Sequence, residues 1–409
     1  MVFKEKELTV LQDRHVQHMN PSRSLAESIL SALKQCLPTN DRPIALHEPS
    51  FSGNEWKYVK ECLDSNWVSS AGPFVSRFEA MLCDFTGVRF AVATVNGTAA
   101  LHICLKAAGV KPDDEVLCPT LTFVATANAI MYCNATPHFV DSDETTLGVD
   151  PKKLEEYLRL KATVRGGECH NTATGRRISA LIVLHTFGHP ADLDSLKEVC
   201  DRFKIALIED AAQSIGSHYK GKHIGHWGIT SGLSFNGNKT ITTGGGGAIL
   251  SNDKAVADYA RHISTTARLP HQWTYFHDEI GYNYRLPSIN AALGCAQLEE
   301  LPSFLEKKRS LAERYRIAFQ EVEGVRFFVE PPYARSNYWL NAILLDPKAG
   351  SRERDLLLEL TNSNGVMTRP AYVLMHNLRM FRGCPRMDLS SAESIEARLV
   401  NIPSSPSLA

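Results

Sequence analysis

The segment from residue 89 to residue 210 alternates apolar strands with helices, and this alternation constrains the fold more than any other feature. Residues 89–95, 178–187 and 204–210 are near-continuous apolar stretches, and helix-forming stretches separate the strands. Strands that are apolar throughout are typical of a parallel sheet with both faces covered, because an exposed face would make alternate residues polar. We therefore predict an α/β fold whose mainly parallel sheet is flanked by helices.

The pattern changes after about residue 270, where helices become more frequent. A chain of 409 residues is long for a single domain. We predict three parts: an N-terminal arm or helix over 1–44, a large α/β domain over 45–268, and a smaller C-terminal α+β domain over 269–409.

Three local patterns lead to more detailed predictions. Residues 161–177 are polar and rich in Gly and Thr, which predicts a surface loop. The segment around Pro302 predicts a kinked pair of helices, because proline interrupts a helix. The interval between Asp210 and Lys239 has room for one helix and one strand.

The composition argues against several classes of protein. The 44 Lys and Arg residues balance 45 Asp and Glu residues, whereas a nucleic-acid-binding protein normally has a basic excess. Neither a bilayer-spanning apolar run nor the apolar segment of a signal peptide is evident, so we expect a cytoplasmic protein without membrane contact. The ten cysteines are scattered without a Cys-x-x-Cys pair, so we expect no metal site and no disulfide framework.

Residues 231–251 place one lysine between two short apolar strands. Lys239 lies in a polar turn, and four glycines, Gly244–Gly247, precede the second strand. A buried lysine amine loses basicity and can form a Schiff base, and glycines allow the backbone to approach a ligand closely. A glycine-rich hairpin with a solvated lysine fits the same pattern, and this stretch alone does not separate the two interpretations.

Two other strands also end in polar groups. Asn96-Gly97-Thr98 opens a helix, where free N–H groups suit a phosphate, although an ordinary helix cap is the alternative. Asp210 ends an apolar strand before two small alanines, and its carboxylate can pair with a protonated ring nitrogen or merely cap a helix. Ligands of open α/β sheets bind beyond the carboxyl ends of strands. The possible phosphate site at Asn96-Gly97-Thr98, the Asp210 carboxylate and the Lys239 amine together predict a pyridoxal phosphate site.

Blocks of sequence from about residue 45 to the C-terminus resemble the DegT/DnrJ/EryC/StrS family of nucleotide-sugar aminotransferases. In order, they are NGTAAL, PTLTFVATANAI, HTFGHPADLD, IEDAAQSIGSHYKGKHIG, SFNGNKTITTGGGGAIL and GYNYRLPSINAALGCAQLEEL. The resemblance implies a fold-type-I, pyridoxal-phosphate-dependent aminotransferase with glutamate as amino donor. SFNGNK is most similar to the branch that acts on UDP-4-keto-6-deoxy-N-acetylglucosamine in bacillosamine and legionaminic acid biosynthesis. The expected product is a 4-amino-4,6-dideoxy sugar nucleotide.

The resemblance also implies roles for individual residues. Lys239 matches the Schiff-base lysine, Asp210 matches the partner of the pyridine nitrogen, and His185 falls in a block near the site and completes the expected catalytic set. The expected cofactor-binding residues are Gly97, Thr98, Phe123, Asp210, Gln213, Ser234, Lys239 and Asn283. Asn283 matches an asparagine that reaches the cofactor of the neighbouring subunit, which implies a homodimer with shared active sites.

Several of these residues fit simpler roles equally well. Phe123 could be a core side chain, Asn283 could serve only its turn, and His185 could be a core histidine with both ring nitrogens satisfied. Arg369, Tyr372 and His376 form a polar set near the C-terminus, and we expect them to bind the sugar nucleotide or the donor carboxylate, since arginine pairs well with either.

Alternative activities remain at this point. One is amination of carbon 3 of a dTDP- or GDP-linked keto sugar. Another is a non-catalytic regulatory protein that binds pyridoxal phosphate, although Lys239, Asp210 and Thr98 are all present. A deoxysugar dehydratase of the same family would have histidine in place of Lys239, so this reaction does not fit the sequence.

Overall fold

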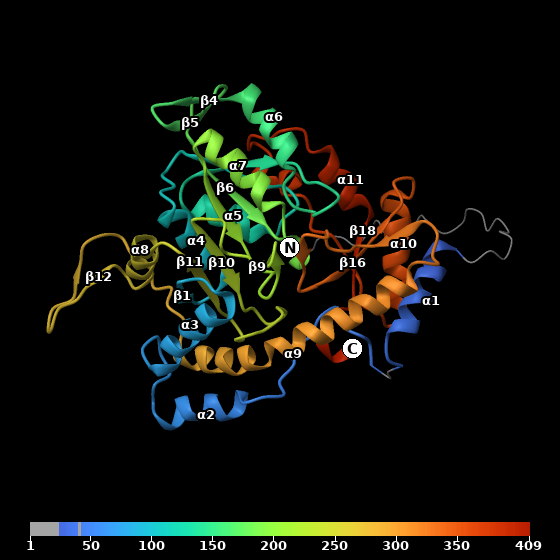
Figure 1. Ribbon diagram of the computed structural model, residues 1–409, viewed down its shortest axis with the longest axis horizontal. Helices are drawn as coiled ribbons and strands as arrows, with labels where there is room; N and C mark the ends of the chain where they lie inside the picture. The colour runs from blue at the N-terminus through green and yellow to red at the C-terminus, as the bar shows by residue number, and fades with distance from the viewer. Residues whose placement is uncertain (1–23, 40–41) are drawn as a thin grey trace, which may run out of the picture.

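The central element of the computed structural model, which describes residues 24–39 and 42–409, is a seven-stranded sheet (Figure 1). Its strands, in spatial order, are β1 (Phe90–Thr94), β11 (Gly247–Ser251), β10 (Thr230–Ser234), β7 (Ala206–Asp210), β6 (Ile178–Leu184), β2 (Glu115–Pro119) and β3 (Thr136–Val140). β11 runs antiparallel to both of its neighbours, and the other pairs are parallel. The prediction of a mainly parallel sheet is confirmed.

Helices cover both faces of this sheet. One face carries α4 (Gly97–Ala107), α5 (Val124–Tyr132) and α8 (Lys254–Ser264), and the other carries α3 (Pro73–Thr86), α6 (Pro151–Lys161), α7 (Leu193–Phe203) and the first half of α9 (Ser288–Ala318). Successive residues of β6 alternate between the two cores: Ala180 and Ile182 face the first set of helices, and Leu181 and Val183 face the second. A strand buried on both faces must be apolar throughout, as this one is.

The C-terminal part contains a second, antiparallel sheet with the strand order β14 (Val325–Phe327), β16 (Asn341–Leu345), β18 (Leu399–Ile402) and β17 (Arg369–Pro370). Packed around it are α1 (Leu25–Cys36), α10 (Gly350–Ser363), α11 (Ser390–Arg398) and the second half of α9. α2 (Glu55–Asp64) packs beside the first half of α9 (Figure 1).

Short elements complete the described chain. They are β4 (Ala162–Arg165), β5 (Glu168–Asn171), β8 (His218–Tyr219), β9 (Lys222–His223), β12 (Arg268–Leu269), β13 (Phe276–His277), β15 (Ala334–Arg335), and the 3-10 turns η1 (Thr186–Gly188), η2 (Met375–Asn377), η3 (Arg379–Phe381) and η4 (Pro406–Leu408).

The division into 1–44, 45–268 and 269–409 stays a prediction. Residues 1–23 and 40–41 of the expected arm lie outside the described residues. The hydrophobic core continues across the second boundary, because the first half of α9 shares a buried cluster with α3 and the central sheet.

The structure corrects three local predictions. Residues 161–177 contain the hairpin β4–β5 instead of a plain loop, because Gly166 and Gly167, with φ of 58° and 83°, form the tight turn that joins the two strands. No helix lies between Asp210 and β10; the short strands β8 and β9 occupy that interval. The pair of helices around Pro302 is the single 31-residue helix α9. Its two halves pack into separate hydrophobic clusters, and this packing outweighs the local cost of the proline.

All ten cysteines lie in the described residues and are free thiols, most of them buried. None of the helices in the described ranges is both long and apolar enough to cross a membrane. The cytoplasmic location stays a prediction.

Candidate active site

A cavity of about 350 Å³ opens where the carboxyl ends of β1, β7 and β10 meet. The predicted residues that line it are Gly97, Thr98, Phe123, Asp210, Gln213, Ser234, Lys239 and Tyr372. The structure therefore brings together residues that are far apart in the sequence, as expected for the strand ends of an open α/β sheet.

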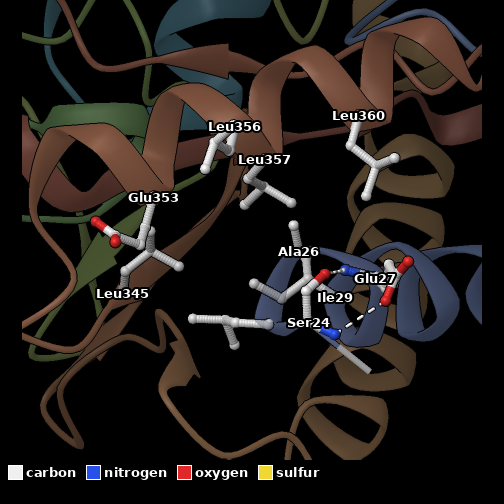
Figure 2. Close-up of a pocket in the computed structure, with 10 residues that line it drawn as sticks. Ser24, Ala26, Glu27, Ile29, Leu345, Glu353, Leu356, Leu357 and Leu360 are labelled. Atoms are coloured by element: carbon white, nitrogen blue, oxygen red, sulfur yellow. Dashed lines mark hydrogen bonds between the residues drawn. The ribbon is translucent and has the colours of Figure 1, made fainter. Parts of the chain in front are cut away.

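A second hollow, between α1 and α10, has a different chemical character. Figure 2 shows Leu356, Leu357 and Leu360 of α10 facing Ala26 and Ile29 of α1. Two glutamates are the charged groups among its described lining residues, and neither faces a cation there. The candidate site is accordingly the cavity at the strand ends, where a cation and an anion converge.

Lys239 lies in the turn between β10 and β11, which pair directly as antiparallel neighbours. The turn is closed by bonds from Lys239 N to Asn236 O (3.0 Å) and from Thr243 N to Phe235 O (3.0 Å). The side chain is half-buried, and burial lowers the pKa of its amine to about 7. The position does not fit a freely solvated lysine at a hairpin tip, because burial favours the neutral form of this amine.

Asp210 is the last residue of β7 and is buried. Burial raises the pKa of its carboxyl group, whereas the Thr126 hydroxyl, which donates to Oδ2 over 2.7 Å, and the Ala212 amide, which donates to Oδ1 over 3.2 Å, lower it. The nearby Lys239 amine also favours the ionised carboxylate. A buried anion with one modest cationic neighbour provides a site for a further positive charge.

The N-terminus of α4 forms a cup beside these two groups. Asn96 caps the helix by accepting from Ala99 N over 2.8 Å, and among the described residues no acceptor takes the amides of Gly97 or Thr98. A Cβ on Gly97 would lie 2.7 Å from Ser234 Cβ, and a Cβ on Gly247 would lie 2.6 Å from the Asn96 carbonyl. These glycines let β10, β11 and α4 meet closely, and the free amides suit an anion.

Aromatic and amide groups complete the mouth of the cavity. Phe123 is 54% exposed at the start of α5, so it is not a core side chain. Its ring lies 5.9 Å from that of Tyr372, whose hydroxyl accepts from Gln213 Nε2 over 3.1 Å. Gln213 Oε1 in turn accepts from Phe187 N over 2.6 Å. A flat ligand could therefore lie between Phe123 and the small Ala212.

His185 does not line the cavity. It is fully buried, its Nε2 lies 3.1 Å from Glu209 Oε2, and its Nδ1 accepts from Ala191 N over 3.2 Å. Glu209 also accepts backbone N–H bonds from Gly225, Trp227 and Gly228. Because both ring nitrogens are engaged, this geometry gives no support to a catalytic role, and His185 holds the loop after β9 through Glu209 instead.

Three other predicted residues also lie outside the cavity lining. Arg369 is exposed on β17, and His376 is buried against Thr120, with Nδ1 2.8 Å from the hydroxyl. Asn283 is exposed near the hairpin β12–β13, where it bridges to Thr265. Within one chain, the expected substrate contacts of Arg369 and His376 are absent from the described cavity lining.

Two residues that sequence reasoning missed are prominent. Thr126 binds Asp210, and Trp339 covers Lys239, with the amine 3.7 Å from the ring centroid. Thr126 stands one turn after Phe123 within the block PTLTFVATANAI, so its proximity to the site could have been suspected. Trp339 comes from the C-terminal part, and no local motif marks it.

The donor set fits pyridoxal phosphate. Lys239 can bind an aldehyde carbon, buried Asp210 can face a pyridinium nitrogen, and the free amides of Gly97 and Thr98 can hold a phosphate. A Cβ on Gly97 would clash with Ser234, so glycine is needed for the helix N-terminus and the Ser234 hydroxyl to lie side by side in the cavity.

Comparison with known proteins agrees with this chemistry. The model of the DegT/DnrJ/EryC1/StrS aminotransferase family matches residues 49–409. A GDP-perosamine synthase from Escherichia coli O157:H7 is 37% identical over 89% of this chain and 94% of its own length. The putative pyridoxal phosphate-dependent aminotransferase EpsN of Bacillus subtilis (strain 168) is 40% identical over 83% of this chain and 84% of its own length. The crystal structure of DesI with its TDP-sugar product is 28% identical, covers 93% of each chain and has a TM-score of 0.79.

These relatives correct one expectation. The branch that acts on UDP-4-keto-6-deoxy-N-acetylglucosamine, predicted from SFNGNK, is not supported, because GDP-perosamine synthases from several bacteria match most of the chain. The bacillosamine and legionaminic acid pathways lose their support with it. A six-residue block in a loop carries less information about the sugar than similarity along the whole chain.

Substituting Gly97 should weaken cofactor binding. We expect Gly97→Ala to bind pyridoxal phosphate about 5- to 150-fold more weakly, since overpacking costs ~1–3 kcal/mol and the new methyl would contact Ser234. Titration of the cofactor-free protein, followed by absorbance, measures the affinity. Gly383→Ala is the control, because its methyl would meet open space. Equal affinity of Gly97→Ala and the native protein would contradict the assignment of the cup.

Removing the Thr126 hydroxyl should destabilise the cofactor-free protein in a pH-dependent way. Burial already raises the folded-state pKa of Asp210 above its ordinary value of 3.8, and Thr126→Val raises it further. Below the pKa of Asp210 in the unfolded protein, the carboxyl group is protonated in both the folded and the unfolded protein, so ionisation costs no stability. As the pH rises through the pKa in the folded protein, the full cost of the buried carboxylate appears. We expect a loss of about 1–3 kcal/mol at pH 7.5 and a smaller loss at pH 4.

Thermal melts at both pH values test this expectation. Thr122→Val is the matched control, because the Thr122 hydroxyl bonds the Thr126 hydroxyl (2.7 Å) and, within the described ranges, donates no hydrogen bond to Asp210. A loss that is the same at both pH values would show that Thr126 acts by packing alone.

Proposed function

The chain belongs to the DegT/DnrJ/EryC1/StrS aminotransferase family and is a pyridoxal-phosphate-dependent sugar aminotransferase, and we propose that it aminates carbon 4 of a GDP-linked 4-keto-6-deoxy sugar with glutamate as the amino donor. The observation that carries the chemistry is the meeting of the Lys239 amine, buried Asp210 and the open N-terminus of α4 in one cavity. The GDP part is supported by relatives named GDP-perosamine synthase.

Each group in the cavity has a role in this proposal. When bound, pyridoxal phosphate supplies an electron-poor ring that stabilises negative charge on the carbon bearing the amino group. Lys239 takes a proton from Cα of the donor and later delivers one to carbon 4 of the sugar, and a pKa of about 7 suits both directions of transfer. Asp210 keeps the ring nitrogen protonated, because a buried carboxylate gains from a cationic partner.

The remaining groups bind and orient. The amides of Gly97 and Thr98 and the Ser234 hydroxyl would hold the cofactor phosphate at the positive end of α4. Phe123, exposed at the cavity mouth, would cover one face of the cofactor ring and limit access of water. Tyr372 orients Gln213 and stands beside Phe123, a position from which it can contact the substrate.

We further propose that the active enzyme is a homodimer whose sites are shared. The hairpin β12–β13 projects from the body (Figure 1) and exposes large apolar side chains: Trp273 is 79% exposed and Tyr275 is 73% exposed. His262 of α8 holds the base of the hairpin through Asp278 (2.7 Å). An apolar surface on a fixed projection is typical of an interface, and Asn283 at its base would then reach the partner's cavity.

A panel of keto sugars tests the substrate. We expect the purified enzyme, given glutamate and GDP-, UDP- or dTDP-linked 4-keto-6-deoxy sugars, to show a kcat/KM at least about 10-fold higher for the GDP sugar, as measured by 2-oxoglutarate release. NMR of the product should place the amino group on carbon 4, and Lys239→Ala should be inactive. Amination at carbon 3, or a preference for UDP or dTDP sugars, would refute the proposed substrate.

Mixing two inactive variants tests the shared site. Lys239→Ala and Asn283→Ala should each lose activity, but after mixing and re-equilibration about a quarter of native activity should return, because half of the dimers are mixed and each has one intact site. Sedimentation velocity should show a dimer of the 45.3 kDa chain that Trp273→Ser weakens and that Leu160→Ser, at an exposed side chain of α6, does not weaken. If the native protein is a monomer, or if no activity returns although mixed dimers form, this arrangement is contradicted.

A further inference from the structure

The Lys239 amine lies against the face of Trp339, 3.7 Å from the ring centroid. This distance is well inside the range in which an ammonium group is attracted to an aromatic ring. Within the described part of the chain, no oxygen or nitrogen atom lies in hydrogen-bonding position to accept from this amine. The indole is therefore its direct partner, and Asp210 acts on it only through space.

The indole is held rigidly by its own contacts. Nε1 donates to Asn238 O over 2.7 Å, which ties the ring to the residue next to Lys239. The backbone N of Trp339 donates to Asn337 Oδ1 over 2.8 Å, and its carbonyl accepts from Lys308 Nζ over 3.2 Å. Asn337 Nδ2 also donates to Gln213 O over 3.0 Å. The ring is thus fixed both to the lysine turn and to the segment that follows Asp210.

Few charged groups face this amine. Asp210 from β7 and Lys239 itself are the charged side chains among the described residues that line the cavity. His47, from the segment before α2, feels the charge of Lys239 but bonds Lys308 through Nε2 (3.0 Å), and burial keeps its pKa well below 6.5. The indole face is accordingly the group that can stabilise an ammonium on Lys239 from within contact distance.

We propose that Trp339 is a catalytic residue of the transamination, and that its indole face holds the free Lys239 amine and stabilises the ammonium formed when this amine accepts a proton. The inference rests on the proposed proton-transfer role of Lys239. A base that must also act as an acid needs its two forms to be similar in free energy. Burial disfavours the ammonium, and the electron-rich face offsets part of this penalty.

An aromatic face suits this task better than a carboxylate would. A carboxylate in contact would form a short charge-assisted bond, fix the direction of one N–H and hold the proton. The ring attracts the cation without a preferred N–H direction, so the amine can turn between donor carbon and acceptor carbon. The attraction is moderate and shifts the pKa of the amine by about one unit, so it changes the proton balance without holding the proton permanently.

Fluorinated tryptophans test this role without changing the shape of the side chain. Site-specific replacement of Trp339 by mono-, di-, tri- and tetrafluorotryptophan progressively weakens the electron-rich face and preserves packing and the Nε1 donor. In the full chain loaded with pyridoxamine phosphate, which leaves the Lys239 amine free, the pH dependence of Lys239 acetylation, read by mass spectrometry, reports the pKa of that amine. We expect this pKa to fall steadily, by about one unit across the series.

The control is the same series at Trp227, whose Nε1 donates to Asp194 and which does not line the cavity; it should leave the Lys239 pKa unchanged. A second variant, Trp339→Phe, should lower the pKa to an intermediate degree. A constant pKa across the Trp339 series would overturn the inference even if the sugar is aminated normally. A falling pKa with no amination of any keto sugar would instead refute the proposed function and leave the contact established.

Discussion

The common direction of the central strands is the constraint on which the site depends. Because β1, β7 and β10 all end at the same edge of the sheet, the residues that follow them meet although long stretches of sequence separate them. The reversed strand β11 returns the chain from this edge, and its first residue, Gly247, touches the Asn96–Gly97 backbone. The phosphate cup, the carboxylate and the lysine therefore follow from topology, and glycine is required where the backbones come closest.

The electrostatics of the site follow from burial acting on opposite charges. Burial raises the pKa of Asp210 and lowers that of Lys239, and each group partly offsets the shift of the other. Neither group has a bonded counter-ion among the residues that the structure describes: Asp210 accepts from a hydroxyl and an amide, and Lys239 contacts an indole face. A direct ion pair between them would satisfy both charges and leave no reason to bind a charged cofactor. Their separation keeps both groups reactive.

The sequence could predict the site residues that follow the ends of strands, but it could not predict roles that are set by contacts between distant parts of the chain. Asp210 closes an apolar strand, Asn96-Gly97-Thr98 opens the helix after another, and Lys239 lies in the turn after a third, so their convergence followed from the pattern. His185 also ends a strand, but its partner Glu209 is one strand away, and only the tertiary structure shows that this pair serves the loop after β9. The UDP nucleotide was predicted from the loop motif SFNGNK, and the residues of such a loop are not fixed by packing against the sheet. The proposed GDP sugar rests instead on similarity over the whole chain to relatives named GDP-perosamine synthase.

The C-terminal part completes the site through contacts that leave no local trace in the sequence. Lys308 of α9 is fully buried, has no carboxylate partner in the described part of the chain, and bonds His47 Nε2, Trp339 O and Ser404 O through its amine. A buried amine is costly unless every donor is used, and these three acceptors come from three separate segments of the chain. The cost of burying the Lys308 amine is explained if its bonds hold Trp339 in place, because the indole face of Trp339 contacts Lys239. The contact that the C-terminal part makes with Lys239 thus depends on three bonds that hold Trp339 and its neighbours in place.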